Sequence, residues 1–368
     1  MKIVFTSYLY LQAFSDPEAW LQRIAPVTGI MDALAKNADV LSIERINYEG
    51  ELVKNNVRYR FLKFSKAFIR FPKRIHQIIK AENPDIVCVN GMIFPLQLIQ
   101  LRKAIGPKPK IIVLHRAEKP CRGIKAFLQK IADKSVDAYL FSSAGLADTW
   151  LEKKQIAAAS KVHEVMQASS CFTISDKYTA KEITKVKGDP VYLWVGRLEN
   201  NKDPLTVIRA FLAFLRDSAD AKLYMIFQED KLLPEVQTLI LSVPYGASAI
   251  RLVGKIPYAE LGNWYNSADF IISGSHYEGS GVAVCEAMSC GCIPLLTDIF
   301  SFRKMTGPGI CGLLYKAGDH RDLLNKLRAS AAMDIQREKM KTLTQFKQEL
   351  SFEAIAGKIM QVAGSLRK

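Results

Sequence analysis

The sequence lacks any apolar run long enough to cross a bilayer as a helix, which excludes the class of helical membrane-spanning proteins. Its first residues, MKIVFTSYLYLQAF, also lack the cleavage pattern of a secretory signal peptide and predict a first β-strand instead. We therefore expect a cytoplasmic protein. A peripheral position on the inner face of the plasma membrane stays open as a further expectation.

Cysteine is sparse, with seven in 368 residues, an odd number that favours a reducing compartment over a disulfide framework. Cys285, Cys290 and Cys292 lie close together, but no second cluster completes a zinc set, and packing in the core is the alternative interpretation. We therefore expect no metal site and no cofactor.

The chain does contain enough apolar sequence for two α/β domains, since 49% of its 368 residues are hydrophobic. Strand-like runs alternate with helical patterns, an order typical of parallel sheets covered on both faces. A polar, Lys-rich stretch at 175–190 indicates a linker. We predict domains over residues 1–187 and 188–350, followed by a helix at 351–368. Strands are expected at 2–6, 39–43, 57–62, 85–90, 110–115, 138–142, 191–195, 222–228, 249–253, 269–273, 293–297 and 312–315.

Residues 269–297, DFIISGSHYEGSGVAVCEAMSCGCIPLLT, predict a strand, a glycine-rich loop, a helix and a second strand. A parallel unit of this kind places its loop at the carboxyl edge of the sheet, where open α/β folds bind ligands. Gly279 and Gly281 permit positive φ, which leaves the N–H groups of Gly281 and Val282 available to an anion at the amino end of a helix. The stretch therefore indicates a phosphate site.

Two carboxylates accompany this loop. Glu278 lies in it, and Glu286 follows after roughly 12 Å of helical rise, so the two reach different parts of one ligand. Carboxylates accept hydrogen bonds from ribose and sugar hydroxyls, while the amides around Ser280 hold a diphosphate. The stretch suits a nucleotide sugar, and a glycine-rich turn of any Rossmann-like protein is the alternative.

The segment VYLWVGRLENNKDP, residues 191–204, predicts a buried strand, a loop and a helix with Asp203 as its cap. Arg197 and Lys202 bring two cations to the carboxyl edge, where they can neutralise a diphosphate. Surface ion pairs are the alternative. A further polar residue, His115, ends the strand KIIVLH at the carboxyl edge of the first domain, and a purely structural histidine is the alternative there.

Positive charge is concentrated in the first half: residues 1–187 hold 30 Lys and Arg against 17 Asp and Glu, a net charge of +13 out of +15 for the chain. The basic segment 54–80 has nine basic residues, no acidic one and several aromatic ones. Phe68, Phe71, Ile75 and Ile78 share one helix face, which suits an anionic membrane surface. Ordinary core packing is the alternative. No recognised motif supports nucleic acid as a partner.

The motifs together resemble a known family. EGSGVAVCEAMSCGCIP resembles the E-x7-E signature of the family 4 (group 1) glycosyltransferases, and VYLWVGRLENNKDP is similar to their strand-GR-x4-K segment. RLVGKIPYAELGNWYNSADFIISGS and GLLYKAGD are similar to the segments before and after the signature. The resemblance is much weaker before His115, as is usual for the domain that recognises the acceptor.

The resemblance implies a GT-B fold, with two Rossmann-like domains whose parallel sheets face a central cleft and a last helix that crosses back to the first domain. It implies acceptor binding by 1–187 and donor binding by 188–350. A retaining, metal-independent enzyme would move a sugar from a UDP- or GDP-sugar to a glycan or lipid-linked acceptor, in cell-surface polysaccharide or glycolipid synthesis. The catalytic residues implied are His115, Glu278, Arg197 and Lys202, and the donor-binding residues are Gly196, Arg197, Lys202, Glu278, Gly279, Ser280, Gly281, Val282 and Glu286.

Two departures from the family pattern affect the donor and acceptor contacts. The Gly-Gly loop near the amino end is reduced to Gly29, which leaves open whether Thr28 and Gly29 contact the diphosphate, and HEVMQASSCF stands where a Pro-Asn-Gly turn is common. The competing hypotheses are a nucleotide-sugar epimerase of the same fold and a non-catalytic membrane-binding or nucleic-acid-binding module.

Overall fold

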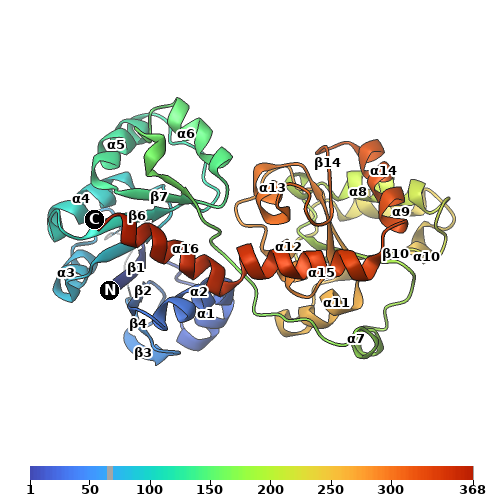
Figure 1. Ribbon diagram of the computed structural model, residues 1–368, viewed down its shortest axis with the longest axis horizontal. Helices are drawn as coiled ribbons and strands as arrows, with labels where there is room; N and C mark the ends of the chain where they lie inside the picture. Colours follow the sequence, from blue (N-terminus) through green and yellow to red (C-terminus); the bar gives the residue numbers. More distant parts are fainter. Residues whose placement is uncertain (64–68, 368) are drawn as a thin grey trace. The chain divides into compact units, whose positions relative to one another are not determined.

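The computed structural model describes residues 1–63 and 69–367. These residues form two compact units: unit 1 comprises Met1–Ser169 and Ser351–Lys368, and unit 2 comprises Ser170–Leu350. Each unit is a sheet covered by helices (Figure 1). No helix in the described part of the chain is long and apolar enough to cross a bilayer.

Unit 1 is built on an eight-stranded sheet in the order β3-β4-β2-β1-β5-β6-β7-β8. All its pairs are parallel except the hairpin of β3 with β4, which turns at Asn55 and Asn56 with φ of 50° and 63°. The strands are β1 (Lys2–Ser7), β2 (Asp39–Glu44), β3 (Gly50–Lys54), β4 (Val57–Phe61), β5 (Ile86–Asn90), β6 (Lys110–Leu114), β7 (Ala138–Phe141) and β8 (Val162–Glu164).

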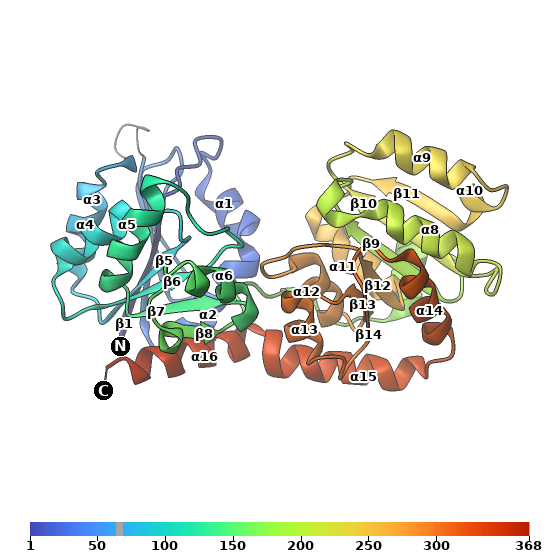
Figure 2. The same cartoon turned by 90° about the horizontal axis from the view of Figure 1, so that it is seen from above.

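Helices cover both faces of this sheet, because parallel strands with apolar residues on both sides need two layers. On one face α3, α4 and α5 lie side by side, and on the other α2 packs with α16 (Figures 1 and 2). The helices of unit 1 are α1 (Pro17–Arg23), α2 (Ala25–Ala35), α3 (Lys73–Glu82), α4 (Pro95–Ile105), α5 (Ile124–Ala132), α6 (Asp148–Glu152) and α16 (Phe352–Ser365).

The last helix crosses back to unit 1, as the family resemblance implies. Ser351 caps α16 by accepting from the N–H of Ala354 at 3.2 Å, and Glu353 pairs with Lys36 at 3.0 Å. Gly29 of α2 lies against the ring of Phe352, so a Cβ at residue 29 would approach the Phe352 Cζ to 2.4 Å. Gly29 therefore permits the close packing of α2 against Phe352.

Unit 2 has a six-stranded, wholly parallel sheet in the order β11-β10-β9-β12-β13-β14. Its core includes Trp194, Phe211 and Phe270. The strands are β9 (Val191–Gly196), β10 (Lys222–Phe227), β11 (Ile250–Gly254), β12 (Phe270–Ser273), β13 (Ile293–Thr297) and β14 (Leu313–Tyr315). The helices are α7 (Lys177–Thr184), α8 (Pro204–Phe214), α9 (Leu233–Leu241), α10 (Gly246–Ala249), α11 (Leu261–Ser267), α12 (Val282–Ser289), α13 (Phe300–Thr306), α14 (His320–Ala331) and α15 (Ile335–Gln345).

All twelve strands predicted from the sequence are confirmed to within two residues at each end, while β3 and the short β8 were not predicted. The segment 170–187 belongs to unit 2, because the N–H of Ser175 donates to Asn266 Oδ1 at 2.7 Å and Lys177 pairs with Asp269. The break between the compact units thus lies 18 residues before the predicted boundary at 187.

The basic segment 54–80 contributes mainly to the core of unit 1. Val57 and Phe61 of β4 and Ile75 and Ile79 of α3 are each 0% exposed, and Ile78 is 9% exposed. Phe71 is exposed, and Phe68 lies outside the described residues. The predicted apolar membrane-facing side was therefore wrong for Ile75 and Ile78, which pack inward and leave Lys73 and Arg74 exposed.

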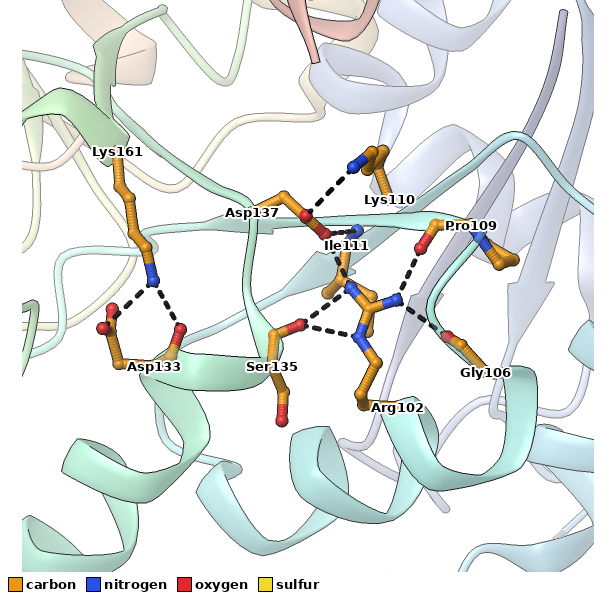
Figure 3. A network of polar contacts seen from close by, with 9 residues as sticks. All are labelled: Arg102, Gly106, Pro109, Lys110, Ile111, Asp133, Ser135, Asp137 and Lys161. Carbon is orange, nitrogen blue, oxygen red and sulfur yellow. Dashed lines mark hydrogen bonds and ion pairs between the residues drawn. The ribbon is translucent and has the colours of Figure 1, made fainter. Parts of the chain in front are cut away.

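A polar network holds the amino edge of the unit 1 sheet (Figure 3). The Arg102 guanidinium donates to the carbonyls of Pro109 at 2.6 Å and Ser135 at 3.0 Å and to Asp137 Oδ2 at 2.6 Å. Asp137 also accepts from the N–H of Ile111 at 2.8 Å. These contacts join α4 to the starts of β6 and β7, at the edge opposite to the one where α/β folds bind ligands.

Candidate active site

The strand order of unit 2 creates a switch point between β9 and β12. Two helices leave the neighbouring strands there, α8 after β9 and α12 after β12, so the loops that precede them meet at the carboxyl edge. The first loop, 197–203, carries Arg197 and Lys202. The second, 274–281, carries Glu278 and the glycines. The sequence thus placed its candidate residues on the two loops that this sheet brings together.

Backbone and side-chain contacts hold the two loops close to each other. The N–H of His276 donates to the carbonyl of Asn201 at 2.9 Å, and Asn201 Nδ2 donates to the carbonyl of Tyr277 at 3.0 Å. Gly274 is required at this approach, since a Cβ there would lie 2.8 Å from the Asp203 carbonyl oxygen. The loops form one surface rather than two independent segments.

Lys202 and Glu278 form an ion pair across the two loops, through Lys202 Nζ and Glu278 Oε1. Their side chains are 21% and 14% exposed, so the pair is accessible to a ligand without being fully solvated. The backbone carbonyl of Glu278 accepts from Ser301 Oγ, which fixes the loop. A negatively charged ligand group can therefore take the place of Glu278 beside Lys202.

Arg197 lies in the same loop as Lys202 but pairs with other carboxylates. Its guanidinium is 2.8 Å from Glu199 Oε1 and 3.8 Å from Glu229 Oε1, and its side chain is half exposed. Gly196, the last residue of β9, lies against the Trp194 ring, 3.0 Å from the position of a Cβ. The two predicted cations thus pair with different carboxylates.

The amino end of α12 lies at this edge and has no side-chain cap among the described residues. Gly281 begins it at φ 53°, ψ 52°, a left-handed conformation that favours glycine, and a Cβ there would meet the Phe302 ring at 2.9 Å. The first helical hydrogen bond runs from the N–H of Cys285 to the Gly281 carbonyl at 3.0 Å. The exposed Val282 and the half-buried Gly279 and Ser280 surround this end.

Glu286 is buried at 3% exposure, and both its oxygens accept from tyrosines: Oε1 from Tyr258 at 2.8 Å and Oε2 from Tyr265 at 2.9 Å. Burial raises the pKa of Glu286, and the two hydrogen bonds oppose that rise. The sequence reasoning missed both tyrosines, although YAELGNWY places them seven residues apart on one helical side.

The segment after Ser169 covers these tyrosines. Phe172 packs against Tyr258 and Tyr265, with ring centroids 5.1 and 5.8 Å apart. Ser170 Oγ accepts from Ser289 Oγ on α12 at 2.8 Å. The segment that packs against the two tyrosines bound to Glu286 therefore lies more than a hundred residues before Glu286 in the chain.

His115 lies in unit 1 and is 2% exposed, stacked on Phe141 with centroids 4.4 Å apart. Its Nε2 is 2.8 Å from the Glu118 carbonyl, which requires Nε2 to carry the proton and leaves Nδ1 as an acceptor. Nδ1 is buried and has no partner among the described residues. Burial lowers the pKa of His115, so the ring is neutral near pH 7.

A polar cluster that the sequence did not reveal surrounds His115 at the carboxyl edge of unit 1. Arg116 donates to Asn90 Oδ1 at 2.5 Å and to the Gln167 carbonyl at 2.9 Å, and Glu118 accepts from the N–H of Met92 at 2.9 Å. Three further side-chain atoms of unit 1 are buried without a partner in the described structure: Thr6 Oγ1, Gln167 Oε1 and Ser169 Oγ. Arg116 and Gln167 also line a small, otherwise apolar pocket beside α2 and α16. The members of the cluster are spread from residue 90 to residue 167, so no local sequence motif predicts it.

Residues 1–63 and 69–367 contain no group of three or more His, Cys, Asp or Glu side chains placed to hold a metal ion. Cys285, Cys290 and Cys292 are buried, in agreement with packing in the core.

Comparison with known proteins finds similarity to glycosyltransferases. Residues 176–345 match the family model described as Glycosyl transferases group 1. The chain is similar to the D-inositol 3-phosphate glycosyltransferase of Streptosporangium roseum, with 25% identity over 139 residues, which cover 36% of this chain and 32% of that protein. The enzyme of the same name from Thermobispora bispora is 26% identical over 138 residues, with the same shares. The matched part thus spans about a third of the length of these relatives.

Solved structures extend the likeness to the whole fold. A glycosyltransferase from Rickettsia africae has a TM-score of 0.77 and 16% identity, and the match covers 100% of this chain and 98% of that one. The Anabaena protein Alr3699/HepE in complex with UDP has a TM-score of 0.75 and 14% identity, with 99% and 100% covered. Sucrose-phosphate synthase from Thermosynechococcus elongatus has a TM-score of 0.71 and 16% identity, with 100% and 99% covered. At these identities the likeness establishes a common GT-B fold.

Proposed function

We propose that the chain moves a sugar from a nucleotide-sugar donor to a glycan or lipid-linked acceptor, because residues 176–345 match the family model of the group 1 glycosyl transferases. The transfer retains the anomeric configuration and needs no metal. UDP-sugars are the donors to test before GDP-sugars, because the similar Anabaena protein was crystallised with UDP and with UDP-glucose. Synthesis of a cell-surface polysaccharide or glycolipid is the corresponding role.

The observation that carries this proposal is the ion pair between Lys202 and Glu278 across the two loops of the switch point. A diphosphate bears more negative charge than one carboxylate and competes with Glu278 for Lys202. Its arrival frees the Glu278 carboxylate to accept hydrogen bonds from the hydroxyls of the donor sugar. Binding and alignment of the donor are therefore coupled by the exchange of one ion-pair partner.

Arg197 is proposed to make a similar exchange, from Glu199 and Glu229 to the diphosphate, with two oxygens held by its planar guanidinium. Negative charge grows on the diphosphate as the sugar departs through an oxocarbenium-like state. Arg197, Lys202 and the amides at the start of α12 stabilise this charge, which is electrostatic catalysis on a leaving group. The amides involved are those around Gly279, Ser280, Gly281 and Val282, with Gly196 shaping the opposite loop.

Glu286 is proposed to hold the ribose hydroxyls. A carboxylate has about four lone-pair positions, and the two tyrosines occupy one on each oxygen, so acceptor capacity is left for a ligand. Tyr258 and Tyr265 act as positioning residues, since they fix the rotation of the carboxylate and counter the effect of burial on its pKa.

Unit 1 is proposed to bind the acceptor, in agreement with the assignment of 1–187 to the acceptor and 188–350 to the donor. The unpartnered Nδ1 of His115 and the neighbouring polar atoms at the carboxyl edge are suited to hydroxyl groups, which both donate and accept. His115, neutral near pH 7, serves as an acceptor rather than as a cation.

The experiment that tests the function is a screen of UDP- and GDP-sugars by UDP or GDP release, with and without candidate acceptors and in the presence of EDTA. A transferase releases nucleotide slowly by hydrolysis and faster with acceptor. A nucleotide-sugar epimerase changes the donor without any acceptor. A non-catalytic module releases no nucleotide with any donor, and that result in the complete screen contradicts the proposal.

A further inference from the structure

Helix α5 of unit 1 presents a large apolar face to solvent. Ile124, Phe127 and Ile131 are 81%, 65% and 38% exposed. They are spaced by three and four residues, so they lie on one side of the helix. A continuous exposed face of this kind is unusual for an isolated soluble domain, where exposed apolar residues are generally scattered.

The opposite side of α5 is firmly attached to the domain, so the apolar face is held outward. Gln129 and Ala132 are 0% exposed against the rest of unit 1. At the end of the helix, Asp133 Oδ1 accepts from Tyr139 OH at 3.0 Å. Lys161 Nζ donates to Asp133 Oδ2 at 3.1 Å and to the Asp133 carbonyl at 2.6 Å (Figure 3). Rotation of α5 to bury its apolar residues would break these contacts.

Positive charge surrounds the apolar face. The segment 119–134, KPCRGIKAFLQKIADK, contains five basic residues and one acidic residue, Asp133, which is buried at 3% exposure and paired with Lys161. All five basic residues are exposed: Lys119, Arg122, Lys125, Lys130 and Lys134. Long basic side chains at the margin of an apolar strip place their charges at the level of lipid headgroups while their stems cover apolar surface.

We propose that the α5 face, defined as Ile124, Phe127 and Ile131 with the five exposed basic residues of 119–134, binds the surface of an anionic bilayer. An outward apolar strip bordered by cations is the arrangement of a helix that lies in the plane of a membrane interface. Charge complementarity favours an anionic bilayer, because its headgroups attract the five exposed basic side chains. The only acidic residue of 119–134, Asp133, is buried and does not oppose this attraction. The membrane contact is thus assigned to α5 and not to Ile75 and Ile78 of segment 54–80, which are core.

The neighbouring helices support this assignment. In a parallel α/β sheet the helix that follows a strand starts at the carboxyl edge, so α4 and α5 both begin there. Ile93, just before α4, is 38% exposed and Phe71, just before α3, is 55% exposed. The Ile69 carbonyl accepts from Gln97 Nε2 of α4 at 3.0 Å, which keeps the start of α3 beside α4. Phe71, Ile93 and Ile124 therefore lie at or just before the amino ends of three helices, α3, α4 and α5, which are neighbours in Figure 2.

This geometry brings the carboxyl edge of unit 1 close to the bilayer. Of the two acceptor classes in the proposed function, a lipid-linked acceptor suits this edge better than a free glycan. That step rests on the proposed function, whereas membrane binding itself does not, and the two are measured separately.

The test is sedimentation of the full-length protein with vesicles of equal parts phosphatidylglycerol and phosphatidylcholine, and with vesicles of phosphatidylcholine alone. We expect binding to the anionic vesicles, at least tenfold weaker binding to the neutral ones, and a marked fall in binding when salt rises from about 0.1 to 0.5 M, where the screening length is roughly halved. The triple variant Ile124→Ser, Phe127→Ser, Ile131→Ser should bind at least tenfold less. A second variant, Lys125→Gln, Lys130→Gln, Lys134→Gln, should lose the preference for anionic lipid.

The matched control is Ile183→Ser, Leu241→Ser, Met340→Ser, which removes exposed apolar residues of 59%, 71% and 62% exposure from three separate helices of unit 2. It should bind vesicles as the native chain does. Absence of vesicle binding by the native chain, or equal binding by the native chain and the α5 triple variant, overturns the proposal. The proposal is also overturned if sedimentation velocity shows the native chain as a dimer and the α5 triple variant as a monomer, since a second copy would then cover the face.

UDP affinity separates this result from the proposed function. The α5 variants should bind UDP as the native chain does in calorimetry, because α5 lies in unit 1 and the proposed donor residues lie in unit 2. If neither the native chain nor the variants bind any nucleotide, the proposed function fails. The vesicle result then still decides the membrane proposal.

Discussion

The polar groups at the carboxyl edges of the two sheets have different kinds of partners. In unit 2 the charged groups are partly exposed and paired with each other, as Lys202 is with Glu278 and Arg197 with Glu199. In unit 1 the half-buried Arg116 donates to uncharged partners, Asn90 Oδ1 and the Gln167 carbonyl, and several buried atoms, including His115 Nδ1 and Gln167 Oε1, lack a partner in the described structure.

This difference indicates whether a substitution at each edge should affect ligand binding or the stability of the fold. Partly exposed ion pairs contribute little to stability, so the charges of unit 2 can be removed at small cost to the fold and large cost to a ligand. Buried charged hydrogen bonds are costly to break, so the cluster of unit 1 is expected to affect folding when it is changed. Substitutions at the two edges should therefore separate into binding defects and stability defects.

The largest effect is expected for Arg197→Ala with Lys202→Ala. If both cations stabilise the leaving diphosphate, kcat/KM should fall by about 10³ to 10⁴, in line with the loss of two preorganised electrostatic contacts. The melting temperature should change little. Steady-state kinetics and thermal melting check both parts, and near-native turnover would remove the proposed role.

Arg116→Ala should give the opposite pattern, a loss of stability. It removes the hydrogen bonds to Asn90 and Gln167 from a guanidinium whose pKa burial lowers to about 10, and the expected cost is about 3 kcal/mol in the free energy of unfolding. Arg74→Ala is the control, because Arg74 is half exposed where it pairs with Glu49, and its loss should cost at most about 1 kcal/mol. Equal costs in urea titrations would break the comparison between buried and exposed charges.

Glu278→Gln should separate binding from turnover. The variant releases Lys202 from its carboxylate, so UDP affinity should stay equal or rise a few-fold, while kcat should fall by about 10² because the donor sugar loses its charged acceptor. Calorimetry with UDP and kinetics with the UDP-sugar measure the two quantities. A large loss of UDP affinity would mean that Glu278 supports the loop and is not exchanged for the diphosphate.

The smallest effect is expected for Tyr258→Phe. Its hydrogen bond lowers the pKa of Glu286, so its loss should raise that pKa further above the ordinary value. Ribose hydroxyls donate best to the ionised carboxylate. The midpoint at which UDP affinity is lost on acidification should therefore move to higher pH, by about 1 unit or less. An unchanged profile from pH 5 to 8 would show that Tyr258 does not position Glu286 for the ligand.

The fold and the position of the two candidate loops of unit 2 could be predicted from the sequence because each signal there is local. VYLWVGRLENNKDP and EGSGVAVCEAMS each contain a strand end or helix start together with the candidate residues. The ion-pair partners could not be predicted, since Lys202 and Glu278 lie 76 residues apart and meet through the strand order.

Unit 1 was harder for the same reason. Arg116, Asn90 and Gln167 come from three separate segments, and their contacts depend on tertiary packing that no periodicity encodes. The apolar periodicity of α3 was read correctly as a helix face, but periodicity does not tell a core-facing side from a membrane-facing one. Burial of Ile75 and Ile78 decides for the core, while α5, with a similar pattern, turns its apolar residues outward.

The most direct test of the central claim is calorimetric titration of UDP into Lys202→Ala and Lys304→Ala. Both lysines are 21% exposed and ion-paired in unit 2, Lys304 with Glu349 at 2.9 Å, but only Lys202 lies on the switch-point loops. We predict that Lys202→Ala weakens UDP binding by at least about tenfold, the loss of one charged contact, while Lys304→Ala binds as the native chain does. Equal affinity of the two variants would contradict the account.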